Sequence, residues 1–241
     1  MKAICFVLAG IIVAGCNPVG DHMVRRDGDS GSGQSSSVTS ARLDMGQDHP
    51  VDVASRNIIR SYGSTIRKYS SRYNLDWRLV LAVMKCESSF NPSAESHRGA
   101  LGFMQIMPST GEEVGKALKK NVLLHPRDNI HGGAYYLSQL YALFPSAEPA
   151  ERLKLTLAAY NAGIGRVYDA QDVATYLHED PNTWEAVQDA LPLLSKRYYT
   201  LHQNVWGDGK PPVGWFGSAR ETISYVKTVM EYYEEYRLFL N

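Results

Sequence analysis

Apolar residues recur at helical spacing along most of the chain beyond residue 54. The first such stretch forms a stripe that steps by three and four positions through Ile59, Tyr62, Ile66, Tyr69 and Tyr73. Residues at this spacing share one face of a helix, so the pattern predicts an amphipathic helix from about residue 54. An apolar run from Leu79 to Met84 follows, and Asp76 is placed to cap a second helix at its N-terminus.

The later part of the chain predicts five more helical segments and few strands. Pro108 suits the first turn of a helix at about 109–118, and others are expected at 129–143, 150–161, 183–194 and from Ser218 onwards. Gly163 ends the third of these, and Pro192 interrupts the fourth. The last helix has an inward face made of Ile223, Val226, Met230, Tyr233 and Leu240, and it follows a loop at 206–218. The predicted fold class is therefore mainly α.

The N-terminus has the pattern of an export signal. A lysine at position 2 precedes an apolar run at 3–14 that is too short to remain as a membrane span. The following Val13-Ala14-Gly15-Cys16 resembles the lipobox of bacterial lipoproteins, which implies a signal peptide at 1–15 and lipid modification, palmitate included, of Cys16. An uncleaved anchor or an ordinary signal peptide are the alternatives. Asn17, where aspartate often marks inner-membrane retention, favours the periplasmic face of the outer membrane.

A polar segment separates this signal from the helical part. Residues 29–40 contain eight serines or glycines in twelve positions, and apolar residues are scarce throughout 16–53. Such a composition cannot form a core, so we expect a flexible tether there and one domain at 54–241.

Charge and cysteine content exclude several classes of function. The chain has 25 basic and 25 acidic residues, so it lacks the basic excess typical of nucleic-acid-binding proteins. Its seven histidines show no metal-ligand spacing, and neither a metal nor a cofactor is expected. Removal of Cys5 with the signal and acylation of Cys16 leave Cys86 alone, which excludes an intramolecular disulfide. Without a cysteine–histidine pattern, Cys86 is interpreted as a core residue rather than a nucleophile.

Glu87 is out of place in this pattern. It follows Val83 by four residues and Met84 by three, which puts a carboxyl group on the apolar face of the second helix. Desolvation disfavours the anion and raises the pKa of such a group, as a general acid for glycosidic cleavage requires. The alternative is a glutamate at the helix end that faces solvent or pairs with Lys85 or Arg98.

Four short stretches favour the catalytic interpretation. ESSFNP (87–92), GALGFMQIMP (99–108), AAYNAGIGRV (158–167) and ETISYV (221–226) occur in this order. They resemble the four motifs of the soluble-lytic-transglycosylase family, lysozyme-like enzymes that cut bacterial peptidoglycan. The helix between the second and third motifs has its counterpart at 128–137, and 184–199 is similar to the branch of membrane-bound transglycosylase F. The resemblance extends from about residue 56 to 240.

This resemblance implies a lysozyme-like helical domain with a substrate cleft. The implied reaction cleaves the β-1,4 bond between N-acetylmuramic acid and N-acetylglucosamine without water and leaves a 1,6-anhydro end, in cell-wall remodelling or turnover. Glu87 matches the single catalytic residue, first an acid and then a base. The positions that match substrate-binding residues of the family are Ser96, Gly102, Met104, Gln105, Tyr160, Asn161, Glu221 and Tyr225. Phe103 replaces the more common leucine of the second motif.

The spacing of the fourth motif adds a geometric expectation. Glu221 and Tyr225 are four residues apart and are expected to project from the same face of the last helix. The expected partners are glycan strands of peptidoglycan and, through Cys16, a membrane; protein partners stay open. Two other functions remain possible: a hydrolase like goose-type lysozyme, which makes reducing ends, and a non-catalytic peptidoglycan-binding protein.

Overall fold

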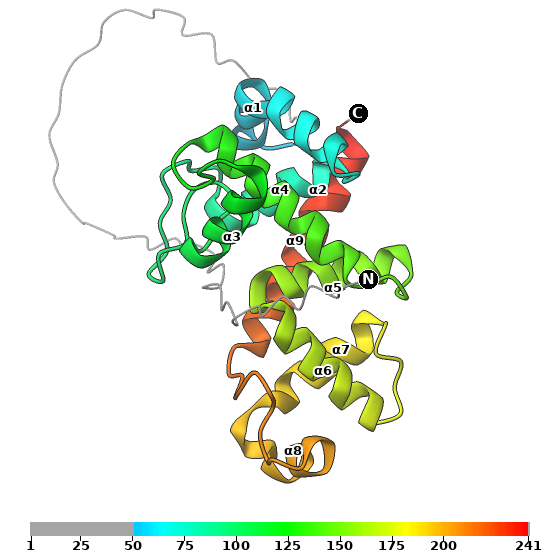
Figure 1. The fold of residues 1–241 in the computed structure, drawn as a ribbon. Helices are drawn as coiled ribbons and strands as arrows, with labels where there is room; N and C mark the ends of the chain where they lie inside the picture. Colours follow the sequence, from blue (N-terminus) through cyan, green and yellow to red (C-terminus); the bar gives the residue numbers. More distant parts are fainter. Residues whose placement is uncertain (1–50, 241) are drawn as a thin grey trace, which may run out of the picture.

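A computed structural model describes residues 51–240, which form nine α-helices (Figure 1). In chain order these are α1 (Val53–Arg72), α2 (Trp77–Ser88), α3 (Pro108–Leu118), α4 (Pro126–Ala142), α5 (Pro149–Ala162), α6 (Ile164–Tyr176), α7 (Trp184–Ala190), α8 (Tyr199–Trp206) and α9 (Ala219–Phe239). Two 3-10 segments, Leu191–Leu194 and Lys196–Tyr198, connect α7 to α8. This part of the chain contains no strand, only two isolated bridges that join Leu101 to Glu95 and to Ile106. The predicted mainly α class is confirmed.

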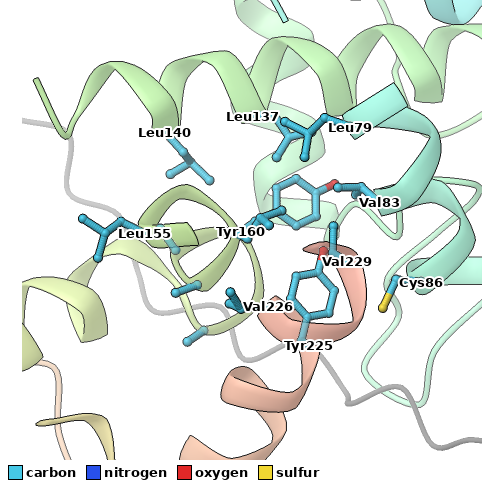
Figure 2. Close-up of a cluster of buried hydrophobic side chains, with 14 of the residues drawn as sticks. Leu79, Val83, Cys86, Leu137, Leu140, Leu155, Tyr160, Tyr225, Val226 and Val229 are labelled. Carbon is cyan, nitrogen blue, oxygen red and sulfur yellow. The ribbon is translucent and has the colours of Figure 1, made fainter. Parts of the chain in front are cut away.

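Helices α2, α4, α5 and α9 meet in the middle of the molecule (Figures 1 and 2). Leu79 and Val83 of α2, Leu137 of α4, Tyr160 of α5 and Tyr225 of α9 all face this core, and each is exposed by 4% or less. Burying one large apolar side chain contributes about 1.5–3 kcal/mol to folding. The core therefore holds together four segments that are far apart in the sequence.

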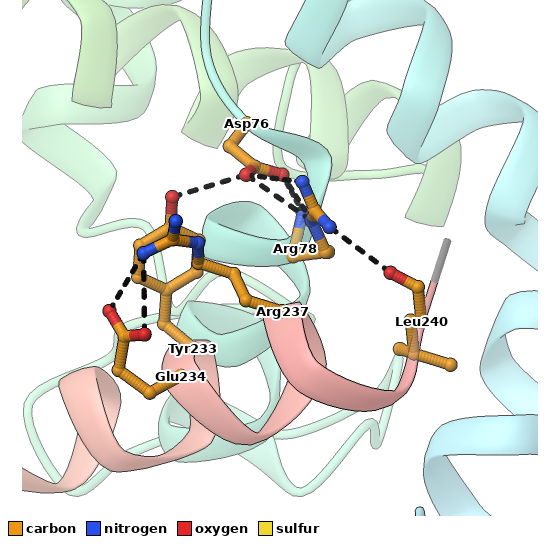
Figure 3. Close-up of polar contacts among 6 residues, drawn as sticks. All are labelled: Asp76, Arg78, Tyr233, Glu234, Arg237 and Leu240. Carbon is orange, nitrogen blue, oxygen red and sulfur yellow. Dashed lines mark hydrogen bonds and ion pairs between the residues drawn. The ribbon is translucent and has the colours of Figure 1, made fainter.

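A polar network fixes the end of α9 beside the beginning of α2 (Figure 3). Asp76 caps α2 as predicted, because its Oδ1 accepts a hydrogen bond from the Arg78 N–H at 2.9 Å. The Tyr233 hydroxyl donates to Asp76 Oδ2 at 3.1 Å, and the Arg78 guanidinium donates to the carbonyl of Leu240 at 3.1 Å. Since Glu87 lies at the opposite end of α2, the network sets the direction from which α9 approaches it.

The folded part begins earlier than the sequence indicated. Val51 is fully buried, and Asp52 caps α1 by accepting a hydrogen bond from the Ser55 N–H at 3.0 Å. Asp52 also pairs with Lys85 of α2. These two residues, assigned to the tether, belong to the packed domain. The predicted signal peptide, Cys16 and the remainder of the tether lie outside the described residues.

Most predicted helices are present, with differences that have physical causes. In α1 the stripe residues pack on the core, but Ile66 alone among them is fully buried and Tyr73 follows the helix as its C-cap. Ser218 occupies the N-cap position of α9 without a capping side-chain hydrogen bond, contrary to prediction.

Helices α6 and α8 were not predicted. Helix α6 was missed because Gly163, at φ +89°, ends α5 and begins α6 with no linker between them. In the eight residues of α8, His202 is the one buried side chain, which leaves no apolar stripe to find.

Two charged residues of α6 hold the loop that leads into α9. The Arg166 guanidinium donates to the carbonyls of Gly214 and Trp215, at 3.3 and 3.2 Å. The Asp169 carboxylate accepts from the Val213 N–H at 3.1 Å. Both side chains are buried, and burial raises the pKa of the Asp169 carboxyl to about 6. The Val213 N–H and the Arg166 cation oppose this shift, and the charge of Asp172 adds to it.

We expect Asp169→Asn to stabilise the domain at alkaline pH. The carboxyl has a higher pKa folded than unfolded, so the native state loses stability as pH rises through about 6. The shift from 3.8 to about 6 corresponds to about 3 kcal/mol above that range. The amide keeps an acceptor for Val213 and cannot ionise. Thermal melts at pH 8 should show a Tm higher by about 5–10 °C, and melts at pH 4 nearly none of this gain.

The exposed Asp189 of α7 provides a matched control, because Asp189→Asn makes the same chemical change without burial. Equal melting temperatures of wild type and Asp169→Asn at pH 8 would contradict this prediction.

Candidate active site

Glu87 lies in the last turn of α2, at the edge of the core. The residues one turn earlier, Val83 and Met84, are fully buried, and Glu87 itself is partly buried. The helix ends at Ser88, and Ser89 then takes a left-handed conformation with φ +49°. The helix thus ends one residue after Glu87, so the carboxyl group lies at a boundary between α2 and the loop at 89–107.

Tyr225 of α9 contacts Glu87 directly. Its hydroxyl donates a hydrogen bond of 2.7 Å to Glu87 Oε1, across 138 positions of sequence. Tyr225 is 2% exposed, and burial raises the pKa of its hydroxyl well above the ordinary range, as does the charge of Glu87. The hydroxyl therefore stays protonated and donates. The contact holds Oε1 of the Glu87 carboxyl group in place, and it thereby sets the direction in which Oε2 points.

The second motif is tied to the same core by Tyr160. The Tyr160 hydroxyl donates a hydrogen bond of 2.6 Å to the carbonyl of Met104. Burial raises the pKa of Tyr160 well above its usual range, with the charge of Glu87 as the next cause. Ser88 Oγ donates to the neighbouring carbonyl of Phe103 at 3.0 Å. The second motif is thus held by one hydrogen bond from α2, next to Glu87, and one from α5.

Several predicted binding residues use their polar atoms to shape the loop. Gln105 has φ +44°, and its Nε2 donates to the carbonyls of Ala94 and Gly102, at 3.1 and 2.9 Å. Ser96 Oγ accepts a hydrogen bond from the Ala100 N–H at 3.0 Å. Gly102, at φ +77°, is buried inside this turn. These contacts place the three residues on one folded loop that follows Glu87.

The third and fourth motifs meet through Asn161 and Thr222. The Thr222 hydroxyl donates to Asn161 Oδ1 at 2.8 Å, and both side chains are buried. Within the described residues, Asn161 Nδ2 has no hydrogen-bond partner. Glu221, next to Thr222, is exposed, whereas Tyr225 one turn later is buried. Glu221 and Tyr225 are four residues apart in α9, as the sequence shows, but only Tyr225 packs into the core.

Three residues of this site were not singled out from the sequence: Ser88, Asn129 and Thr222. Ser88 and Thr222 stand inside the motifs that were recognised, beside residues that were. Asn129 is the second residue of the segment at 128–137, between the second and third motifs, and it donates to and accepts from the loop backbone. Position within a motif was the only sequence signal for Ser88 and Thr222. Hydrogen bonds to loop backbone, such as those of Asn129, follow no periodic pattern.

A pocket of about 410 Å³ adjoins the site. Its lining comes from three helices and one cap: Glu113, Val114 and Ala117 of α3, Tyr135, Tyr136, Gln139 and Leu140 of α4, the C-cap Leu143 of that helix, and Ile164, Gly165 and Tyr168 of α6. The ring of Tyr136 lies 5.5 Å from that of Tyr160, which connects the pocket to the second and third motifs. Burial raises the pKa of Tyr136 to about 12. The lining is largely aromatic and aliphatic, with Glu113 as its one charged residue.

Within residues 51–240, no group of three or more histidine, cysteine, aspartate or glutamate side chains is arranged to hold a metal ion. The side chains of the site offer a carboxyl group that can exchange protons, and hydroxyl and amide groups that can orient a polar ligand.

Comparison with known proteins gives concordant matches. Residues 64–181 match the family model described as the transglycosylase SLT domain. The membrane-bound lytic murein transglycosylase F of Desulfosudis oleivorans is 36% identical over 172 residues, which cover 70% of this chain and 35% of that protein. Its namesake from Serratia proteamaculans is 34% identical over 178 residues, or 73% and 33% of the two chains. This chain thus spans about a third of the length of these curated relatives.

The fold is similar to that of a solved lytic transglycosylase structure. The 70 kDa soluble lytic transglycosylase SLT70 from Escherichia coli superposes with a TM-score of 0.53 and 28% sequence identity. The superposition covers 75% of this chain and 24% of that one. The expected lysozyme-like helical fold is confirmed by this match.

Proposed function

Because this chain belongs to the family of the transglycosylase SLT domain, we propose that the protein is a lytic transglycosylase of peptidoglycan. It cleaves the β-1,4 bond between N-acetylmuramic acid and N-acetylglucosamine and forms 1,6-anhydromuramic acid ends, in remodelling or turnover of the cell wall. The observation that carries the proposal is the hydrogen bond between Tyr225 and Glu87. It joins the fourth motif to the first at the one carboxyl group that the family resemblance assigns to catalysis.

In this mechanism Glu87 acts twice. Its protonated carboxyl group gives a proton to the glycosidic oxygen, and the bond from that oxygen to C1 of the muramic acid breaks. The C6 hydroxyl of the same sugar attacks C1, and its proton passes to the Glu87 carboxylate. The products are an anhydro ring and a free hydroxyl on C4 of the glucosamine, and no water is consumed. The substrate supplies its own nucleophile, so no second enzyme carboxylate is needed, in contrast to retaining glycosidases.

Tyr225 orients the carboxyl group for both steps. By donating to Oε1 it leaves Oε2 to face the glycosidic oxygen and then the C6 hydroxyl. A fixed donor in a buried position also stabilises the carboxylate that forms after proton transfer. Its own raised pKa keeps it from losing the proton at the pH of the reaction.

The remaining site residues are proposed to hold the sugars. The loop of Ser96, Gly102, Met104 and Gln105 forms one wall, shaped by its internal hydrogen bonds. Asn161, whose Nδ2 is buried and without a partner in the described residues, offers a donor for a sugar carbonyl or hydroxyl. Tyr160 supports the loop, and Glu221 reaches the cleft from its exposed position on α9.

The pocket beside Tyr160 gives room for the strand to continue beyond the cleaved bond. Tyrosine faces such as those of Tyr136 and Tyr168 suit the apolar sides of sugar rings.

Product analysis tests the function against its alternatives. Purified protein is incubated with peptidoglycan sacculi, and the released muropeptides are identified by mass spectrometry. A transglycosylase releases anhydro ends, which are lighter than reducing ends by one water molecule. Reducing ends would instead indicate a hydrolase like goose-type lysozyme, and the absence of any release would indicate a non-catalytic binding protein.

The cellular location is proposed as the periplasmic face of the outer membrane, through a lipid on Cys16. The support is the lipobox-like Val13-Ala14-Gly15-Cys16 and the term membrane-bound in the names of the relatives. None of the helices in the part of the chain that the structure describes has the length and apolar character to cross a bilayer. A polar tether at 17–50 would let the anchored domain reach the cell wall.

We expect Cys16→Ser to move the protein from the membrane fraction to the soluble fraction. Acyl chains provide the anchoring energy, and serine cannot carry the thioether-linked lipid. Fractionation of cells that express either form, followed by immunoblotting, measures the change. Cys86→Ser serves as the control, since Cys86 is buried inside the domain. A Cys16→Ser protein that still sediments with membranes after a high-salt wash would refute the anchor.

A further inference from the structure

We propose that Asn129 is a positioning residue for glycan binding: its buried carboxamide fixes the turn at 101–104 relative to the helix that carries Glu87. The inference rests on the proposed function, because the turn is a proposed wall of the sugar site. It assigns to Asn129 an effect on the affinity for substrate and none on the proton transfers at Glu87.

Both ends of the Asn129 side chain are engaged by loop backbone. Oδ1 accepts a hydrogen bond from the Met104 N–H at 2.9 Å. Nδ2 donates to the carbonyls of Leu101 and Val122, at 3.0 and 3.2 Å. The orientation of the amide is unambiguous, because an N–H needs an acceptor and two carbonyls need a donor. Asn129 is 1% exposed, so none of these groups would find water if the side chain were removed.

Gly102 fits against the same side chain. A Cβ at position 102 would lie 2.7 Å from Cγ of Asn129 and 2.8 Å from its Oδ1, closer than side chains approach one another. The backbone of Gly102 also has φ +77°, which glycine adopts without strain. The glycine of the second motif is thus required by the close approach of Asn129 as well as by its own conformation.

The turn is held from three helices at once. Asn129 of α4 takes the N–H of Met104, Tyr160 of α5 donates to the carbonyl of Met104, and Ser88 of α2 donates to the carbonyl of Phe103. Ser88 follows Glu87 directly and is itself anchored in α2, with Oγ 3.2 Å from the Met84 carbonyl. Two of these three attachments come from α2, which carries Glu87, and α5, which carries the third motif. The third attachment, from Asn129, comes from a different helix, α4. Its loss would let the sugar wall shift while Glu87 and Tyr225 keep their contact.

Asn129→Asp separates positioning from packing. The carboxylate keeps the volume and an acceptor for Met104, but it places an oxygen against the carbonyls of Leu101 and Val122 in place of a donor. We expect KM for soluble glycan strands to rise by about five- to tenfold, as the loss of one or two hydrogen bonds implies, with kcat within about twofold of wild type. Assays are run well below the melting temperature of each variant.

Asn121→Asp is the matched control. Asn121 is exposed, lies in the loop before α4, and accepts from the Leu123 N–H through Oδ1, a role that aspartate retains. It should leave both KM and kcat unchanged. If Asn129→Asp fails to fold, Gly102→Ala presses on the same contact from the loop side and should raise KM in the same way.

Binding measured without cleavage distinguishes this inference from the function itself. In a Glu87→Gln background, the Kd for a tetrasaccharide of alternating N-acetylglucosamine and N-acetylmuramic acid should rise by about the same factor when Asn129→Asp is added. A wild-type enzyme that yields no anhydro products would refute the proposed function and leave this comparison intact. A fall in kcat at unchanged KM and Kd, or no effect at all, would show that Asn129 has only a structural role.

Discussion

Replacing Glu87 by glutamine should abolish cleavage of peptidoglycan and leave the fold intact. The rate should fall by roughly 10²–10⁴-fold, the contribution of a positioned general acid and base. The amide has the shape of the carboxyl group, and its Oε1 can still accept the hydrogen bond from the Tyr225 hydroxyl. It cannot give a proton to the glycosidic oxygen or take one from the C6 hydroxyl. Release of soluble muropeptides from sacculi measures the loss.

The exposed Glu231 of α9 provides the control for this substitution. It pairs only loosely with Lys227, at 3.9 Å, so Glu231→Gln should retain full activity. Circular dichroism and thermal melts establish that both variants are folded. If Glu87→Gln digested sacculi at more than a few per cent of the wild-type rate, the catalytic assignment of Glu87 would be wrong.

Tyr225→Phe is expected to lower turnover by at least about tenfold, since the loss of one oriented donor in an active site typically costs about 10²–10³-fold. The ring stays in the core between α2, α5 and α9, and only the hydroxyl that donates to Glu87 is removed (Figure 2). Without it, the carboxyl group loses its fixed orientation towards the glycosidic bond. The melting temperature should change little, because most of the buried surface is retained. Initial rates of anhydro-muropeptide release provide the measurement.

Tyr233→Phe separates catalysis from packing on the same helix. Tyr233 is also buried, and its hydroxyl donates to Asp76 at the other end of α2 (Figure 3). Its removal should lower stability and leave turnover per folded molecule unchanged. Near-wild-type turnover of Tyr225→Phe would place Tyr225 among the packing residues.

The helical framework was predictable because it depends on periodic burial and local caps. The apolar spacing beyond residue 54 predicted α1, and Asp76 marked the start of α2. Prolines and glycines marked the limits of α3 and α5. The features that were missed depend on contacts between distant residues or on one residue with two roles. Gly163 serves two helices at once, and Asp52 looked like tether because its partner Lys85 is 33 positions away. Contacts between distant segments leave no periodic trace.

The site was predictable only in part, for the same reason. Glu87 stood out as a carboxyl group on an apolar face, but nothing in its spacing indicates Tyr225, which lies 138 positions later and was assigned through resemblance alone. Asn129 was not identified at all. Its partners are backbone groups, and any residue type can present a backbone N–H or carbonyl, so their positions carry no signature. Only the folded arrangement brings them within hydrogen-bond distance.

The source of the oxygen atoms in the products tests the central claim most directly. Sacculi are digested with purified enzyme in water enriched in oxygen-18, and the released muropeptides are analysed by mass spectrometry. Since the C6 hydroxyl of the substrate is the proposed nucleophile, the products should be anhydro-muropeptides that contain no heavy oxygen. Reducing ends labelled with oxygen-18 at C1 would show that water attacks, and would contradict the assignment of this protein as a lytic transglycosylase.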